Sequence, residues 1–164
     1  MDGPNTKEWG PALWGIFHTF AERTGGQRTA LKEDEEKRRW RSFLMSLRAC
    51  IPCPRCKKHY EDYIRTHPVD GLFRLKGADW GIALRQWLWT FHNEVRVSSS
   101  QPVDIPFEQV SELYGSIPIE QIQLWKQTLQ DNIRKGMFLR LYIRDDMMHC
   151  IRLLEELYIC LSVR

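Results

Sequence analysis

Residues 50–56 read Cys-Ile-Pro-Cys-Pro-Arg-Cys, so that two prolines frame one of three closely spaced cysteines. Pro52 pushes the residue before it out of the α-helical region, and a preceding helix therefore has to end there. Pro54 suits the first turn of a new helix, where its missing N–H group costs nothing. The run predicts a helix, a sharp bend, and a second helix that starts at Cys53.

Cys53 and Cys56 form a CxxC pair at the start of this second helix. The free N–H groups and the macrodipole of a helix N-terminus favour a negative charge, and so do the neighbouring cations Arg55 and Lys57. The thiolate is the reactive form of cysteine in thiol–disulfide exchange. The local sequence therefore favours a redox-active pair.

Two other interpretations of this stretch remain open. Cys50, Cys53, Cys56 and His59 read as C-x2-C-x2-C-x2-H, a spacing that also suits zinc or an iron–sulfur cluster. Such a chain would be a non-enzymatic helical interaction protein with a structural metal site. The cysteines could instead be buried residues without chemistry. A c-type haem site is excluded, because Lys57 stands where its histidine is required.

Apolar residues recur at three- and four-residue spacing through most of the chain, and no strand-like alternation is present. The fold class is therefore all-α. The charged run 32–39 is expected to face solvent, and Gly136 is expected to separate the last two helices. Helices are predicted over 9–23, 33–49, 53–67, 78–95, 107–114, 119–134 and 137–163.

Charge and hydropathy narrow the class of partner. The 24 basic and 21 acidic residues give a formal net charge of +3, which is too small to suggest nucleic-acid binding. No apolar run approaches the roughly 20 residues of a membrane span, and residues 1–8 resemble neither a signal nor a transit peptide. We expect a cytoplasmic protein with no membrane or nucleic-acid partner. Its cysteines are then expected to be catalytic or metal-binding rather than structural disulfides.

Three segments, 9–21, 51–60 and 84–95, together resemble the Erv/ALR family of FAD-dependent sulfhydryl oxidases. The first carries the glycine, tryptophan and histidine of the family's opening helix in register. The second is similar to its aromatic-Pro-Cys-x-x-Cys stretch, and the third to its His-Asn-x-Val helix ending. Their order and spacing over residues 7–115 make the set specific, and the family members most similar to it are those of large cytoplasmic DNA viruses.

The resemblance implies a four-helix bundle that binds FAD, formed by residues 1–115, with a helical C-terminal extension over 116–164. It implies Cys53 and Cys56 as the catalytic pair. Aromatic rings can stack on a flavin or an adenine, while histidine and asparagine can direct hydrogen bonds in an apolar slot. The residues implied in the cofactor pocket are Gly10, Pro11, Trp14, His18, Tyr60, Trp87, His92, Asn93, Val95 and Arg96.

The implied reaction moves electrons from a dithiol through the CxxC disulfide and FAD to oxygen, which gives hydrogen peroxide. Cys53 would form the mixed disulfide with the substrate, and Cys56 would face the flavin. The implied partners are reduced substrate proteins and oxygen. A homodimer is implied as well, and a viral member would work in the host cytoplasm or the virion.

Several positions depart from the family pattern, including Arg96, where many members have asparagine, and Gln101, near which they have lysine. Many members have arginine at the position of Pro11, and they carry a second, structural disulfide where this chain has Trp89 and Pro106. We expect that disulfide to be dispensable here.

Cys150 and Cys160 are the candidates for an additional electron-relaying pair. If 137–163 is one continuous helix, ten residues of rise separate them by roughly 15 Å, whereas a disulfide needs Cα atoms within about 7 Å. We therefore predict that they do not pair within one chain. Cys150 shares a face with the leucines of that helix and is expected to be a small buried apolar residue.

Overall fold

A computed structural model describes residues 3–103 and 105–162, and in these residues the chain forms helices and no strands. This confirms the all-α prediction. None of the described helices has both the length and the apolar composition that crossing a bilayer requires. The elements are α1 Thr6–Glu22, α2 Ala30–Cys50, α3 Pro54–Thr66, η1 Val69–Arg74, α4 Gly77–Ser98, η2 Phe107–Gln109, α5 Val110–Tyr114, α6 Ile119–Phe138 and α7 Arg144–Ser162.

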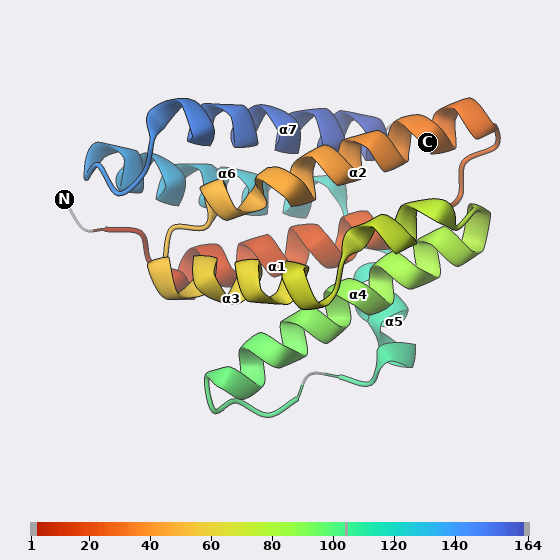
Figure 1. Cartoon of the computed structure of the whole chain (residues 1–164), viewed down its shortest axis with the longest axis horizontal. Helices are drawn as coiled ribbons and strands as arrows, with labels where there is room; N and C mark the ends of the chain where they lie inside the picture. The colour runs from red at the N-terminus through yellow and green to blue at the C-terminus, as the bar shows by residue number, and fades with distance from the viewer. Residues whose placement is uncertain (1–2, 104, 163–164) are drawn as a thin grey trace.

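The last two long helices lie against the first two. Figure 1 shows α7 running beside α2 and α6 lying between α7 and α1 in this view, with α3 and α4 on the other side of the bundle. Gly15 permits the close approach of α6, because a Cβ atom there would lie 2.8 Å from the Trp125 ring. A single apolar core includes Ile16 and Leu88 as well as Leu154. The division at residue 115 stays a prediction, and the core is continuous across it.

The turn between α6 and α7 is placed differently from the prediction. The expected break at Gly136 is wrong, since α6 continues through it to Phe138. Arg140 ends the helix instead, with φ at 56° and its N–H group bonded to the Met137 carbonyl at 3.0 Å. Gly136 is required for packing, because a Cβ atom there would overlap the ring of Tyr142.

The expectation of a solvated face over residues 32–39 fails at Glu36, which is completely buried. Its Oε1 atom accepts hydrogen bonds from the Gly25 N–H group and the Trp80 indole N–H group, each at 2.9 Å. Its Oε2 atom accepts one from the Gln27 amide at 2.8 Å. Burial of a carboxylate is tolerated when such partners satisfy it. Glu36 thereby joins the α1–α2 loop to α4.

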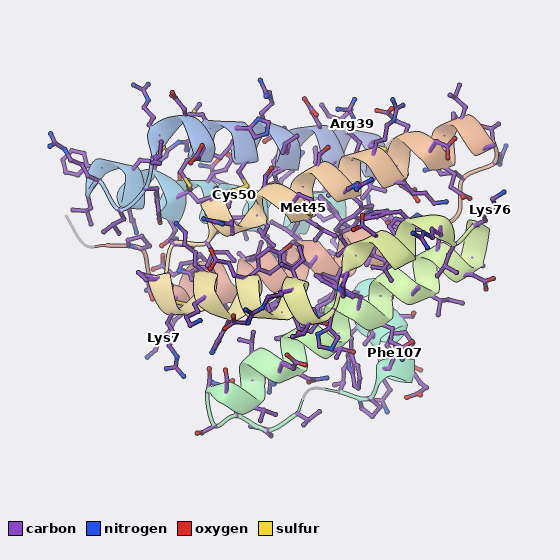
Figure 2. The ribbon with its side chains drawn as sticks, in the orientation of Figure 1. Lys7, Arg39, Met45, Cys50, Lys76 and Phe107 are labelled. Carbon is purple, nitrogen blue, oxygen red and sulfur yellow. A yellow bond between two sulfur atoms is a disulfide. The ribbon has the colours of Figure 1, made fainter. Side chains whose placement is uncertain are left out.

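A disulfide joins Cys50 at the end of α2 to Cys150 on α7, with a Cα–Cα distance of 6.1 Å. Figure 2 shows Cys50 at that helix end, below α7. The expectation that Cys150 is simply a small buried apolar residue is therefore wrong, and so is the expectation of no structural disulfide. Cys160, also on α7, is a free thiol. The prediction that Cys150 and Cys160 do not pair is confirmed.

We predict that Cys150→Ser lowers the free energy of unfolding by about 4 kcal/mol, because the lost disulfide closes a long loop. The sequence separation of its two cysteines is 100 residues. Guanidinium denaturation of the oxidised protein measures the change. Cys160→Ser is the control, and we expect a shift of about 0.5 kcal/mol or less. The Cys50–Cys150 disulfide would be refuted if wild type and Cys150→Ser were equally stable. It would also be refuted if a peptide map under non-reducing conditions lacked the linked peptides.

Candidate active site

Cys53 is the residue that caps the N-terminus of α3. Its backbone is extended, Pro54 follows as the first helical residue, and the Cys53 sulfur accepts a hydrogen bond from the Cys56 N–H group at 3.2 Å. Cys53 and Cys56 form a disulfide with a Cα–Cα distance of 5.1 Å. The predicted bend and helix start are confirmed. After reduction, the helix N-terminus favours the thiolate form of a sulfur in this place.

The cations beside the pair have different neighbours. Arg55 is exposed and donates a hydrogen bond to the Ser98 carbonyl at 3.1 Å. The Lys57 ammonium lies 5.2 Å from the centre of the Tyr142 ring, on the α6–α7 turn. The positive charge therefore extends from α3 toward the C-terminal helices.

A narrow, mainly apolar cavity of about 140 Å³ lies on the inner side of the pair. Cys56 is part of its wall, and Cys53 is not among the described residues that line it. The two sulfurs consequently have different surroundings, one at the helix tip and one facing inward. The remaining wall consists of Thr6, Trp9, Gly10, Leu13, Trp14, Phe17, Leu47, Ile51, His59, Phe91, Val95 and Ser99.

Two more open hollows adjoin this cavity, and Val95 lines all three. One, of about 360 Å³, has Trp14, His92 and Arg96 in its wall. The other, of about 250 Å³, lies between α3 and α4 and shares Phe91 with the cavity. The cavity is mainly apolar, and the two hollows beside it carry polar side chains as well, a combination that is usual in a site for a large organic ligand.

Stacked rings form the wall between the cavity and the hollow of about 360 Å³. The Trp14 ring lies parallel to His92, with 4.1 Å between centroids and 11° between planes. His92 Nδ1 is 3.0 Å from Nε2 of the buried His18, and Tyr114 stacks on His18 with 4.8 Å between centroids. The rings come from α1, α4 and α5, so this wall depends on three separate elements.

The structure separates the predicted cofactor residues into two groups. His18 and Asn93 are buried in the wall, but are not among the described residues that line the hollows. Tyr60 donates to the Leu44 carbonyl at 2.5 Å, and Trp87 donates to the His67 carbonyl at 2.9 Å. These four residues are buried and do not line the three hollows. The residues that do line the hollows are Gly10, Pro11, Trp14, His92, Val95 and Arg96.

Several residues in the wall were missed by the sequence-based prediction. His59 follows Cys56 by three residues, so helical spacing alone places both on one side of α3. Phe91 precedes Val95 by one turn on α4, and the same rule identifies it. Tyr114 lies outside the three family-like segments, and no sequence signal indicates its contact with His18.

Trp89 and Pro106 occupy the positions where the resemblance implies a second disulfide in the family. The Trp89 indole N–H group donates to the Ile105 carbonyl at 2.9 Å, and the ring meets Phe107 edge-on with 5.9 Å between centroids. This bond fastens the segment before α5 to α4. A hydrogen bond and an aromatic contact therefore hold Trp89 to the residues on either side of Pro106.

The metal-site interpretation is not favoured. Cys50, Cys53 and Cys56 belong to two disulfides, and His59 lies in the cavity wall. Residues 3–103 and 105–162 contain no group of three or more potential metal ligands.

Comparison with known proteins points to one family. Residues 11–113 match the sequence model of the Erv1/Alr family. The FAD-linked sulfhydryl oxidase ERV1 of Arabidopsis thaliana is 29% identical over 120 residues, which cover 73% of this chain and 56% of the relative. A Frog virus 3 (isolate Goorha) protein named as a proposed FAD-linked sulfhydryl oxidase, 088R, is 37% identical over 76 residues, 41% of this chain and 48% of the relative.

This chain thus spans about half the length of the curated relatives that it matches. No solved structure shows a significant match. The family match covers well over half of the chain and includes the CxxC pair and most of the cavity wall. The chain therefore belongs to the Erv1/Alr family.

Proposed function

We propose that the chain is an FAD-linked sulfhydryl oxidase that forms disulfide bonds in substrate proteins. The observation that carries this proposal is the position of Cys56, which belongs to a CxxC disulfide and also lines an aromatic cavity. In the overall reaction, two thiols and one oxygen molecule give one disulfide and one hydrogen peroxide. Membership of the Erv1/Alr family and the names of the two relatives support the same activity.

The residues around the cavity fit FAD. A Cβ atom at Gly10 would meet nothing within 4 Å, so the backbone of α1 is open to a flat ligand there. Trp14 and His92 supply ring surface, and Arg96 supplies positive charge at the rim for a pyrophosphate. When bound, FAD supplies a two-electron acceptor that oxygen can reoxidise. Cys56, which lines the cavity, is the sulfur that we expect to face it.

The chain's own chemistry is a disulfide exchange at Cys53. A substrate thiolate attacks the Cys53 sulfur, the Cys53–Cys56 bond breaks, and Cys56 leaves as a thiolate. The second substrate thiolate then attacks the mixed disulfide and releases Cys53 as a thiolate, so that the substrate gains a disulfide and the pair gains two electrons. The two protons that the substrate thiols lost on ionisation are available to the two cysteine thiolates. Cys53 caps the helix beside the exposed Pro54 and Arg55, which favours it as the sulfur that meets the substrate.

The other cysteines are not placed to take part. Cys160 is a free thiol, and burial raises its pKa, with the nearby Glu36 and Glu35 carboxylates adding to the effect. It therefore stays protonated at neutral pH and is a poor nucleophile. Cys50 and Cys150 are buried and linked to each other. Homodimerisation and a cytoplasmic location stay predictions.

We predict that Cys53→Ser and Cys56→Ser each reduce dithiol-dependent oxygen consumption to the background rate while bound FAD is retained. The reason is that the pair performs the exchange, whereas the ring-lined wall holds the cofactor. An oxygen electrode measures turnover, and the visible spectrum of the purified protein measures flavin. Cys160→Ser is the control and should keep the wild-type rate. Near-normal turnover in either CxxC variant would exclude this mechanism.

A second prediction concerns cofactor binding. Trp14→Ala and His92→Ala should lower the FAD content per chain, because both remove ring surface from the site. Excess FAD at a thousand times its Kd should stabilise wild type by about 4 kcal/mol, and the two variants should lose most of this gain.

Trp89→Ala removes an equal ring outside the three hollows, where the indole bonds to Ile105, and serves as the matched control. It should melt at a lower temperature than wild type but keep its FAD-dependent stabilisation. A folded Trp14→Ala protein with a full complement of FAD would remove Trp14 from the pocket.

A further inference from the structure

The turn between α6 and α7 exposes an unusual amount of apolar surface. Phe138 and Ile143 are each 69% exposed, and Leu141 is 51% exposed. Single exposed apolar residues are common, but several within six residues of one turn form a patch of the kind that contacts another molecule.

This turn also forms one side of a pocket of about 440 Å³. Arg48 and Ala49, near the end of α2, form the opposite side, and Lys57 of α3 forms part of the wall. Figure 1 shows these three pieces, the α6–α7 turn, the end of α2 and the start of α3, at the same end of the molecule. The pocket is lined by Arg48, Ala49, Lys57, Arg140, Leu141, Tyr142, Ile143 and Asp146.

The pocket lies close to the CxxC disulfide. Lys57 follows Cys53 by four residues on α3, which corresponds to one turn and about 6 Å of rise. Its ammonium group lies over the Tyr142 ring at 5.2 Å, so the α6–α7 turn approaches α3 at this level. The Cys50–Cys150 disulfide holds α7 against the end of α2. A molecule that occupied the pocket would therefore sit beside Cys53 on a covalently supported surface.

Charge indicates the chemistry of the occupant. The lining contains three cations, Arg48, Lys57 and Arg140, and one carboxylate, Asp146. Glu61 pairs with Arg48 at 3.2 Å and offsets the charge of that side chain. Lys57 and Arg140 against Asp146 still leave the lining with a net positive charge. Complementary charge speeds encounter and sets partner choice. A ligand for this place has carboxylates for the cations and a large apolar side chain for the exposed turn.

We propose that this pocket, called the turn pocket below, docks the substrate polypeptide. Its occupant is an extended segment of the reduced substrate protein that carries acidic residues and one large apolar residue near its cysteine pair. The inference rests on the proposed function, because the substrate thiol must reach Cys53.

Two matched pairs of variants test the proposal. Arg140→Glu reverses a charge in the turn pocket, and Arg38→Glu reverses one on the exposed surface of α2. Ile143→Ser removes an apolar side chain from the patch, and Ile159→Ser removes one of similar exposure, 61%, elsewhere on α7. None of the four residues lines the cavity on the inner side of the CxxC pair.

The first measurement is binding without turnover. A fluorescent peptide with the acidic and apolar residues, and with serine in place of both cysteines, is titrated with each protein. Arg140→Glu and Ile143→Ser should weaken binding by about tenfold, the change that about 1.4 kcal/mol of lost interaction produces, while the two controls bind as wild type does. High salt should weaken wild-type binding, and a peptide with lysine for the acidic residues should not bind.

The second measurement is oxygen consumption with the dithiol form of the peptide and with dithiothreitol. Arg140→Glu and Ile143→Ser should raise KM for the peptide and leave the dithiothreitol rate unchanged. Absence of dithiothreitol turnover in wild type would refute the proposed function, whereas the serine peptide would still test docking.

Three results would overturn the turn pocket as a substrate site. The first is equal peptide binding by all five proteins, and the second is equal weakening in the control variants. The third comes from light scattering: a wild-type dimer that Ile143→Ser dissociates would assign the patch to a second copy of the chain.

Discussion

The turn between α2 and α3 directs three sulfurs to three different places, and the site depends on that separation. Pro52 and Pro54 restrict the backbone so strongly that α2 has to stop and α3 has to start within a few residues. Cys53 therefore caps α3, Cys56 faces the apolar cavity, and Cys50 points back toward α7.

Local sequence patterns predicted the helices well where one apolar face meets one core. The ranges for α1 and α4 follow from the 3.6-residue period, and the proline-framed cysteines predict the start of α3. The same reasoning failed at Gly136, because glycine marks helix ends as well as close contacts, and here the contact with Tyr142 decides. It failed again at Glu36, whose partners Gly25 and Trp80 lie outside α2. Patterns within one helix carry no information about such partners.

The site shows the same limit in more detail. Trp14, His92 and Val95 could be predicted because they belong to the family-like segments, and the structure places all three around the hollows. Tyr60 and Trp87 belong to the same segments but point to the Leu44 and His67 carbonyls. A motif identifies the helix on which a residue lies, whereas the side on which its ring packs is decided by the neighbouring helices. The pairing of Cys50 with Cys150 could not be predicted from local patterns, because the two cysteines are 100 residues apart in the sequence.

The C-terminal helices contribute to both the stability of the bundle and the surroundings of the reactive pair. Trp125 of α6 packs over Gly15 of α1, so α6 supports the helix that carries Trp14. The disulfide of Cys150 links α7 to Cys50, which precedes Cys53 by three residues. The α6–α7 turn contacts α3 as well, because the Tyr142 ring lies under the Lys57 ammonium group. Loss of these contacts would free the end of α2 and the start of α3 together, because one short turn connects them. The position of Cys53 at the tip of α3 and of Cys56 in the cavity wall therefore depends on the same contacts that hold α6 and α7 to the bundle.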